Sequence, residues 1–276
     1  MSAGSSEPRR PVRAPPLRRQ AMEMLWPLEA ATFLAAAPLL RRTRRGDGHP
    51  VLVLPGFTGD DASTVPLRWS IRGQGYSTHP WRLGVNIGPT EAIMTGIRSR
   101  LRELADRHQR TVSIVGWSLG GTYARALARE CPALVRQVIS LGSPYRMVEG
   151  DKSSATALWK RFEHLHDADV DLNRIAEQER PKLTVPATSV YSRRDGVARW
   201  QTCIDEVGPL AENIEVYSSH ASLGVHPAVT FAVLDRLRVP EGQWRPFRAP
   251  CALRLWYPRP VSWRAEPGRR ARLDSV

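Results

Sequence analysis

The segment 113–121 (SIVGWSLGG) constrains the fold of this chain more than any other stretch. It begins as an apolar strand, turns between Gly116 and Gly120, and continues into a helix expected over residues 119–130. Glycines suit such a turn because they let a strand and a helix pack very closely. Ser118, between them, is expected in a strained conformation with its hydroxyl beyond the carboxyl end of the strand. The segment therefore predicts a nucleophilic serine at the edge of a parallel sheet.

The rest of the chain alternates strand and helix patterns in the same way. Strands are expected at 51–54, 76–81, 112–115, 138–141, 187–192 and 213–218, and helices at 21–36, 61–73, 90–108, 119–130 and 227–238. This alternation predicts an α/β fold with a mostly parallel, doubly wound sheet. Residues 145–185 are polar, mostly helical in pattern and without a strand. We expect them to form a helical cap, or lid, inserted above the sheet.

Charge is concentrated at the two ends of the chain. The formal net charge is +13, but residues 1–48 carry 9 basic and 4 acidic residues, and residues 241–276 carry 8 and 3. The region between them is nearly balanced and has no nucleic-acid-binding motif, which argues against a nucleic-acid partner. We expect a disordered basic tail at 1–20, a single α/β domain at 21–250, and an Arg/Pro-rich tail at 251–276. Tryptophans among the tail arginines suit either peripheral membrane contact or, as the favoured alternative, packing on the domain.

The cysteines and the apolar N-terminal stretch bear on location and cofactors. Cys131, Cys203 and Cys251 have neither zinc-site nor disulfide-framework spacing, so we expect reduced thiols, no metal and no cofactor. The apolar stretch 25–40 is interrupted by prolines and a glutamate and is shorter than the roughly 20 residues of a membrane span. A cytoplasmic location is the prediction, and the sequence defines no oligomeric state.

A nucleophilic serine needs a general base, which in hydrolases with this strand–serine–helix motif is a histidine late in the chain. Of seven histidines, only His220 and His226 lie between the last expected strand and the last expected helix. His220 directly follows the strand 213–218, in a loop that can return over the site. His226 precedes Pro227 and is more typical of a helix start. His220 is therefore favoured, with His226 as the alternative.

The acidic partner of the histidine is expected between the serine and the histidine in sequence. Asp195 comes three residues after the strand 187–192 and next to Gly196. A carboxylate there can orient the imidazole and stabilise its protonated form. Asp205 is the reserve candidate, and an ordinary Asp-Gly turn is the structural alternative for Asp195.

The loop after the first apolar strand, 55–59 (PGFTG), is the candidate for the oxyanion hole. The backbone amides of Phe57 and Leu119 are expected to bind the oxyanion. Thr58 and Trp117 are candidate substrate contacts, although Trp117 could instead pack beneath the turn. Trp159 and Phe162 in the cap could cover an apolar acyl chain or simply anchor the cap.

The segments 49–57, 116–121, 141–144, 191–197 and 219–225 together resemble a bacterial family of α/β-hydrolases, the esterase- or lipase-like serine hydrolases. The resemblance spans about residues 21–250. It implies an α/β-hydrolase fold, a triad at Ser118, Asp195 and His220, and oxyanion donors at Phe57 and Leu119. Glycine is usual in the family near Ala221 or Ser222, so the histidine loop departs slightly from the pattern.

These observations predict a hydrolase that cleaves a small-molecule carboxylic ester through an acyl-enzyme intermediate. An acyltransferase with the same triad is the first alternative. A non-catalytic domain of the same fold that binds a ligand or partner is the second. The Ser at position 118 argues against the related polyester synthases, which carry Cys there.

Overall fold

The computed structural model describes residues 11–26, 32, 46–167, 170, 172 and 177–261. Its centre is a six-stranded sheet in the order β2-β1-β3-β4-β5-β6, and all five strand pairs are parallel. The strands are β1 (Pro50–Leu54), β2 (Ser77–Pro80), β3 (Val112–Trp117), β4 (Val135–Leu141), β5 (Ala187–Tyr191) and β6 (Ala211–Glu215). The predicted parallel α/β architecture is thus confirmed.

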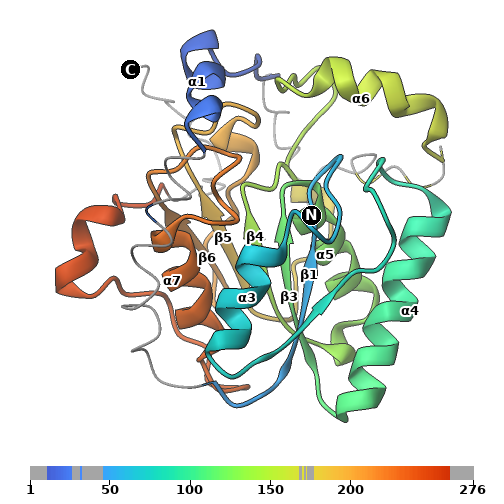
Figure 1. Cartoon of the computed structure of the whole chain (residues 1–276), viewed down its shortest axis with the longest axis vertical. Helices are drawn as coiled ribbons and strands as arrows, with labels where there is room; N and C mark the ends of the chain where they lie inside the picture. The colour runs from blue at the N-terminus through green and yellow to red at the C-terminus, as the bar shows by residue number, and fades with distance from the viewer. Residues whose placement is uncertain are drawn as a thin grey trace, which may run out of the picture.

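Helices cover both faces of the sheet (Figure 1). One face carries α3 (Val65–Gly73) and α7 (Pro227–Leu237), and the other carries α4 (Glu91–His108) and α5 (Leu119–Glu130). Alternate side chains of β1 point to opposite faces, so Val51 and Val53 join the first core and Leu52 and Leu54 the second. Burial on both sides explains why this strand is apolar at every position from 51 to 54.

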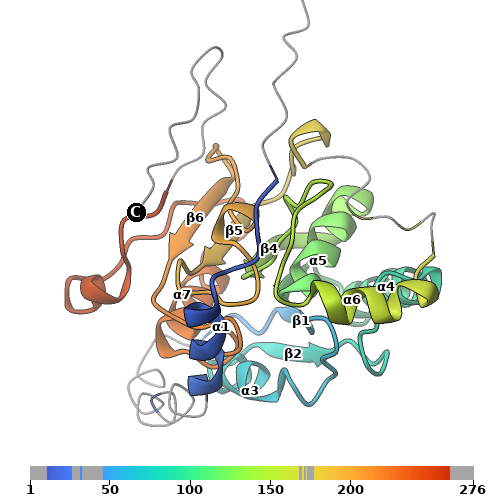
Figure 2. The ribbon, with the colours of Figure 1, turned by 90° about the horizontal axis from the view of Figure 1, so that it is seen from above.

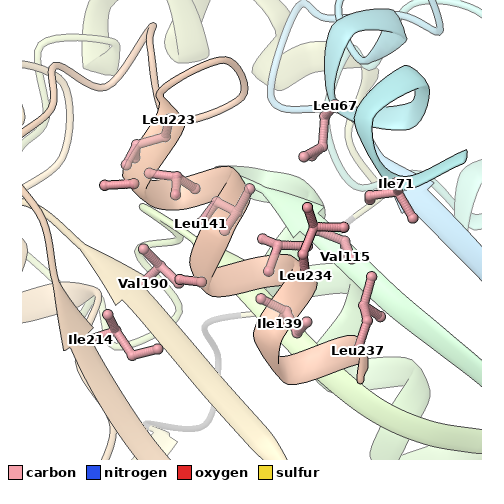
Figure 3. Close-up of a cluster of buried hydrophobic side chains, with 14 of the residues drawn as sticks. Leu67, Ile71, Val115, Ile139, Leu141, Val190, Ile214, Leu223, Leu234 and Leu237 are labelled. Carbon is pink, nitrogen blue, oxygen red and sulfur yellow. The ribbon is translucent and has the colours of Figure 1, made fainter. Parts of the chain in front are cut away.

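Figure 3 shows the first core, in which Leu234 and Leu237 of α7 pack with Ile139 and Val115 of the central strands. The exposed fraction of each of these four residues is 1% or less. This packing fixes α7 against the sheet and so fixes the loop that leads into it, residues 216–226.

Several strand and helix boundaries differ from the sequence prediction, and hydrogen bonds explain two of the differences. The helix expected from residue 61 begins at Val65, because the carboxylate of Asp60 accepts hydrogen bonds from the amides of Ala62 and Ser63 and forms a turn. The last strand ends at Glu215 rather than at 218, since Ser218 turns away and its amide donates to Ser192 Oγ over 3.3 Å.

The tail expected to be disordered as far as residue 20 has a defined conformation from residue 11. It contains α1 (Leu17–Met22), followed by the 3-10 helix η1 (Glu23–Leu25). The amide of Val12 donates to Asp151 over 2.6 Å, and Arg199 donates to the carbonyl of Arg13 over 2.7 Å. Composition predicted disorder, but these backbone groups find partners on the domain. Residues 1–10 and most of the helix expected at 21–36 lie outside the described residues.

The C-terminal segment also packs on the domain for part of its length. The 3-10 helix η7 spans Cys251–Trp256, and the Tyr257 hydroxyl beyond it donates to the carbonyl of Ala228 in α7 over 2.7 Å. The Tyr257 ring lies 4.9 Å from that of Phe247. Packing on the domain therefore holds for Tyr257, and residues 262–276 lie outside the described part of the chain.

The cap expected at 145–185 contains α6 (Thr156–Phe162) and the 3-10 helices η3 (Glu163–Leu165) and η5 (Glu177–Glu179). No strand occurs among its described residues. Figures 1 and 2 show α6 and α1 at the same end of the molecule, set apart from each other. Contacts described below place both at the edge where the strands end.

Candidate active site

Ser118 lies in the sharp turn between β3 and α5, with φ 52° and ψ −123°. A residue with a Cβ rarely adopts this backbone conformation, so the turn stores strain. The glycines around it are required by space. A Cβ on Gly116 would overlap the carbonyl of Gly120, and a Cβ on Gly120 would overlap the carbonyl of Leu54. The strand, the helix and β1 are thus packed as closely as their backbones allow.

The position of Ser118 in the sheet also suits a reactive group. The strand order reverses between β1 and β3, because β2 lies beyond β1 on one side and the later strands lie beyond β3 on the other. Loops diverge at such a switch point, and open parallel sheets bind ligands there. Both Ser118 and the loop 55–59 follow the strands that flank this point.

Asp195 and His220 come together from two different loops. His220 Nδ1 lies 2.6 Å from Asp195 Oδ2, and both side chains are almost fully buried. The other carboxylate oxygen, Oδ1, accepts the amides of Val197 (2.8 Å) and Ala198 (2.7 Å). These two bonds fix the carboxylate, and through it the orientation of the imidazole.

The charge around His220 favours its protonated form. Burial opposes protonation, but the charge of Asp195, the hydrogen bond to it and the charge of Glu23 together raise the pKa of His220 above its usual value. A base of raised pKa is a stronger proton acceptor, which suits general-base work.

The reserve candidates have other roles. The His226 ring accepts the amide of Ala228 over 3.2 Å and so caps the N-terminus of α7. Asp205 forms an ion pair with Arg125 at 2.8 Å. His226 and Asp205 therefore bind other partners and do not pair with each other as His220 and Asp195 do.

The histidine loop is tied to the residue next to Ser118. Trp117 Nε1 donates to the carbonyl of His220 over 3.2 Å, and the two rings lie 6.3 Å apart. Gly142, with φ 57°, passes so close that a Cβ on it would stand 3.2 Å from both Asp195 Oδ2 and His220 Nδ1. Trp117 therefore packs against the histidine loop, and its role as a substrate contact stays a prediction.

The loop 55–59 faces Ser118 from the end of β1. A Cβ on Gly56 would stand 3.0 Å from the Cβ of Ser118, so this glycine allows the close approach. Among the described residues, the amides of Phe57 and Leu119 donate no hydrogen bond. Thr58 is held at φ 62°, and its hydroxyl donates to the Phe57 carbonyl over 2.7 Å. That hydroxyl is thus already engaged within the loop.

Asn86 holds the loop 55–59 in place. The sequence pattern alone did not predict this role. The fully buried side chain donates from Nδ2 to the carbonyl of Pro55 (3.0 Å) and accepts the Tyr123 hydroxyl (3.1 Å). Its backbone accepts the amide of Thr58 (2.7 Å) and donates to the carbonyl of Gly59 (2.8 Å). Asn86 thereby holds both ends of the loop. A lone Asn between glycines, as in 84–88, was the available signal.

Comparison with known proteins agrees with this architecture. A metagenome-derived lipolytic enzyme superimposes with a TM-score of 0.54 at 18% identity, over 71% of this chain and 95% of that one. A pyrethroid hydrolase gives 0.53 at 16%, over 70% and 99%. Lipase B of Aspergillus fumigatus gives 0.51 at 14%, over 68% and 52%. The chain has the α/β-hydrolase fold.

Sequence comparisons add one partial match. A family model described as palmitoyl protein thioesterase matches residues 86–192, which run from Asn86 through the serine turn to the end of β5. A search of curated protein sequences found no match. The α/β-hydrolase fold predicted from the sequence is therefore confirmed by structure, and the substrate is not set by any relative.

The segment expected to form the cap contacts the loop 55–59 through aromatic side chains. The Phe57 ring lies 5.1 Å from Trp159 and 5.9 Å from Phe162, both in α6. Trp159 in turn lies 4.5 Å from His166, whose Nε2 contacts the carbonyl of Ile87 at 2.8 Å. An apolar roof thus covers the side of the site where Phe57 lies.

Besides the predicted Ser-His-Asp set, another one lies at the amino-terminal ends of the neighbouring strands β1 and β3. His49 Nε2 lies 2.8 Å from Ser113 Oγ, and His49 Nδ1 lies 2.5 Å from Asp47 Oδ1. Ser113 and His49 are fully buried, and burial lowers the pKa of His49 to about 4. Ser113 lies within strand β3, next to a shift in its register with β4, and not in a strand-to-helix turn like that of Ser118. This set is a buried hydrogen-bond network that ties β1 to β3.

In the described part of the chain, no three His, Cys, Asp or Glu side chains are grouped so that they could hold a metal ion. None of the helices described is both long enough and apolar enough to cross a membrane. The described cysteines are free thiols.

Proposed function

We propose that this protein is a serine hydrolase that cleaves a carboxylic ester. In this proposal Ser118 is the nucleophile, His220 the general base and Asp195 the group that orients His220. The amides of Phe57 and Leu119 form the oxyanion hole. The observation that carries the proposal is the strained backbone of Ser118, because a fold keeps such strain where it is needed for chemistry.

The proposed reaction follows from this arrangement. His220 takes the proton of the Ser118 hydroxyl as the oxygen attacks the acyl carbon, and the carbonyl oxygen becomes an anion held by the two amides. His220 then gives the proton to the leaving alcohol, and an acyl-serine ester remains. Water, deprotonated by His220, releases the carboxylic acid and restores Ser118. Asp195 stabilises the imidazolium in both steps.

The aromatic roof supports an apolar acyl group. Phe57, Trp159 and Phe162 offer hydrocarbon surface directly above the loop that would hold the oxyanion. The family model for palmitoyl protein thioesterase, which matches residues 86–192, supports including long acyl chains and thioesters among the substrates. The same triad cleaves either bond, since only the leaving group differs.

The first experiment is labelling of the purified protein with a fluorophosphonate probe, which reacts with an activated serine. Wild type is expected to label, and Ser118→Ala and His220→Ala are expected not to. Ser113→Ala is the matched control, because Ser113 also contacts a histidine that contacts an aspartate. It is expected to label like wild type. Folded wild type that fails to label would refute the proposal.

A substrate panel then defines the acyl group. Oxygen esters and thioesters of graded chain length are compared by kcat/KM, with and without an added alcohol or thiol acceptor. Release of free acid supports hydrolysis, whereas transfer to the acceptor supports the acyltransferase alternative. A small-molecule ester substrate, a cytoplasmic location and the absence of a nucleic-acid partner remain parts of this proposal. Contact of the basic tails with a membrane surface is a further part of it.

A further inference from the structure

Residues 11–26, here called the N-terminal strap, cross the edge of the sheet that carries the site. Figure 2 shows α1 of the strap on the side of α7, away from α6. The strap contacts the cap segment through Val12, and the loop after β5 through Arg13, as described above. Its third contact is made by Glu23 in η1.

The Glu23 carboxylate accepts three backbone amides from the two loops that carry Asp195 and His220. Oε1 accepts the amide of Gly196 over 2.7 Å and that of His220 itself over 2.8 Å. Oε2 accepts the amide of Ala221 over 2.8 Å. Hydrogen bonds to a charged acceptor are among the strong ones in proteins. One side chain thus joins the acid loop to the histidine loop.

Gly196 is shaped for this contact. A Cβ on it would overlap the carbonyl of Arg19 in α1. Any other residue at 196 would push the strap away, so the glycine beside Asp195 serves strap docking rather than a free turn. The tertiary contact with the strap therefore explains why a glycine follows Asp195.

We propose that Glu23 is a positioning residue of the hydrolase. It fixes the loops of Asp195 and His220 relative to each other and places negative charge beside the imidazole. This inference rests on the proposed function. The added charge favours the imidazolium that forms when His220 takes the proton of Ser118 or of the hydrolytic water. The three hydrogen bonds limit movement of the Asp195–His220 pair.

The test compares Glu23→Ala and Glu23→Gln with Gln20→Ala in the full chain. Gln20 is the matched control because, within the described part of the chain, its side chain bonds the strap alone, at the carbonyl of Pro15 (2.8 Å). Glu23→Ala is expected to lower kcat/KM about tenfold to a hundredfold, as displacement of a catalytic group by an ångström does. Glu23→Gln keeps the shape but removes the charge and turns a donor toward an amide.

Two readouts separate positioning from a merely structural role. The acidic limb of the pH profile of kcat/KM is expected to move to lower pH in both Glu23 variants, because a negative charge beside His220 has been removed. Hydrogen exchange is expected to become faster at the amides of residues 196, 220 and 221, and to stay unchanged there in Gln20→Ala. The exchange measurement needs no substrate, so it tests the strap even if the ester hydrolase proposal fails.

A Glu23→Ala variant that melts at lower temperature but keeps the wild-type pH limb and wild-type kcat/KM would show that Glu23 only stabilises the fold. Unchanged amide exchange in that variant would show that the three hydrogen bonds do not hold the loops.

A separate observation concerns a hollow of about 540 Å³ beside the strap. Its charged lining residues come from the strap, the acid loop, the end of β6 and the C-terminal segment: Arg18, Arg19, Arg193, Arg194, Glu215 and Arg259. The one carboxylate is already engaged, since Glu215 accepts the Tyr191 hydroxyl (2.9 Å) and pairs with Arg193 (3.3 Å). Among the described residues, the other four arginines form no ion pair.

The arginines are also oriented and crowded. The Arg194 guanidinium lies 4.4 Å above the centre of the Tyr217 ring. Burial and the nearby charges of Arg199 and Arg18 lower the pKa of Arg19. Five arginines and one carboxylate line this hollow. Guanidinium groups gathered in this way suit phosphate groups, which each guanidinium fork can contact with two hydrogen bonds at once.

We infer that this hollow binds an anion with two or more phosphate oxygens available to the guanidinium groups. Calorimetry with inorganic pyrophosphate at 150 mM salt is the test, with Arg194→Gln against Arg102→Gln, an exposed arginine of α4 outside the hollow. Arg194→Gln is expected to weaken binding about tenfold and Arg102→Gln to leave it unchanged. Vesicles containing a phosphomonoester lipid show whether the phosphate source is a headgroup. Absence of pyrophosphate binding, or equal weakening by both variants, overturns the inference.

Discussion

Replacing Ser118 by glycine and by alanine measures the strain that the serine turn stores. Both variants lose the hydroxyl, so neither is expected to label with the fluorophosphonate probe. Alanine keeps the Cβ and must still adopt φ 52° and ψ −123°, whereas glycine adopts this conformation freely. Such strained backbones cost about 1–3 kcal/mol, and glycine costs about 0.5–1 kcal/mol more chain entropy than alanine. Ser118→Gly is therefore expected to be about 1 kcal/mol more stable than Ser118→Ala.

The assay is urea unfolding of the two variants, followed by fluorescence, with thermal unfolding as a second measurement. For a chain of 276 residues, about 1 kcal/mol corresponds to a difference in melting temperature of about 2 °C. The control is the same pair of substitutions at Ser70, which lies within α3 and bonds the carbonyl of Pro66. There glycine is expected to be about 1 kcal/mol less stable than alanine. The reasoning is refuted if the Ser118 pair shows the same order as the Ser70 pair.

Three further outcomes are expected. Asp195→Asn should lower kcat about 10⁴-fold with little change in KM, measured on the best ester of the panel, since the amide favours the wrong imidazole tautomer. Gly116→Ala should destabilise the fold by about 1–3 kcal/mol or more in urea unfolding, and should slow labelling by the probe, because the added Cβ overlaps the carbonyl of Gly120. In the control Gly73→Ala the added Cβ meets nothing within 4 Å, so its stability should stay within about 1 kcal/mol of wild type. Activity needs neutral His220, so kcat/KM should rise with pH through a limb centred above 6.5, the ordinary value, because the pKa of His220 is raised; a limb centred below 6.5 contradicts the electrostatics.

The raised pKa of His220 also sets the direction in which the stability of the fold changes with pH. A histidine whose pKa is higher in the folded state stabilises the fold fully below its unfolded value and loses that contribution as pH rises through the folded value. The buried His49 behaves in the opposite sense. Its pKa of about 4 means that acidification from 6.5 toward 4 protonates it more readily in the unfolded chain and so destabilises the fold.

The sequence predicted the parts of this protein that depend on local pattern. Apolar runs became the buried strands, and the turn at 116–120 lies between a strand and a helix as expected. Asp195 and His220 could be placed because strand ends in a parallel sheet share one edge. The second Ser-His-Asp set could not be foreseen, since it joins Asp47 and His49 to Ser113 across two strands.

The misses share a physical cause. Residues 11–20 were expected to be disordered because their composition has little to bury, yet their backbone groups and Glu23 dock on loops far along the chain. The role of Asn86 depends on four partners in two other segments, the loop 55–59 and α5, and the residues next to Asn86 in sequence do not reveal them. Composition and periodicity describe what a segment can do alone, not which distant partner it meets.

The hydrogen bond between Glu23 and the amide of His220 spans 197 residues. Contacts of such long range are slow to form and close late, after the sheet between them exists. On the ribosome Glu23 emerges before all six strands of the sheet, and its partner His220 is made only after the last of them. The proposed catalytic pair would be completed only after the whole sheet has folded, so partly folded chains would carry the serine turn without the proposed base.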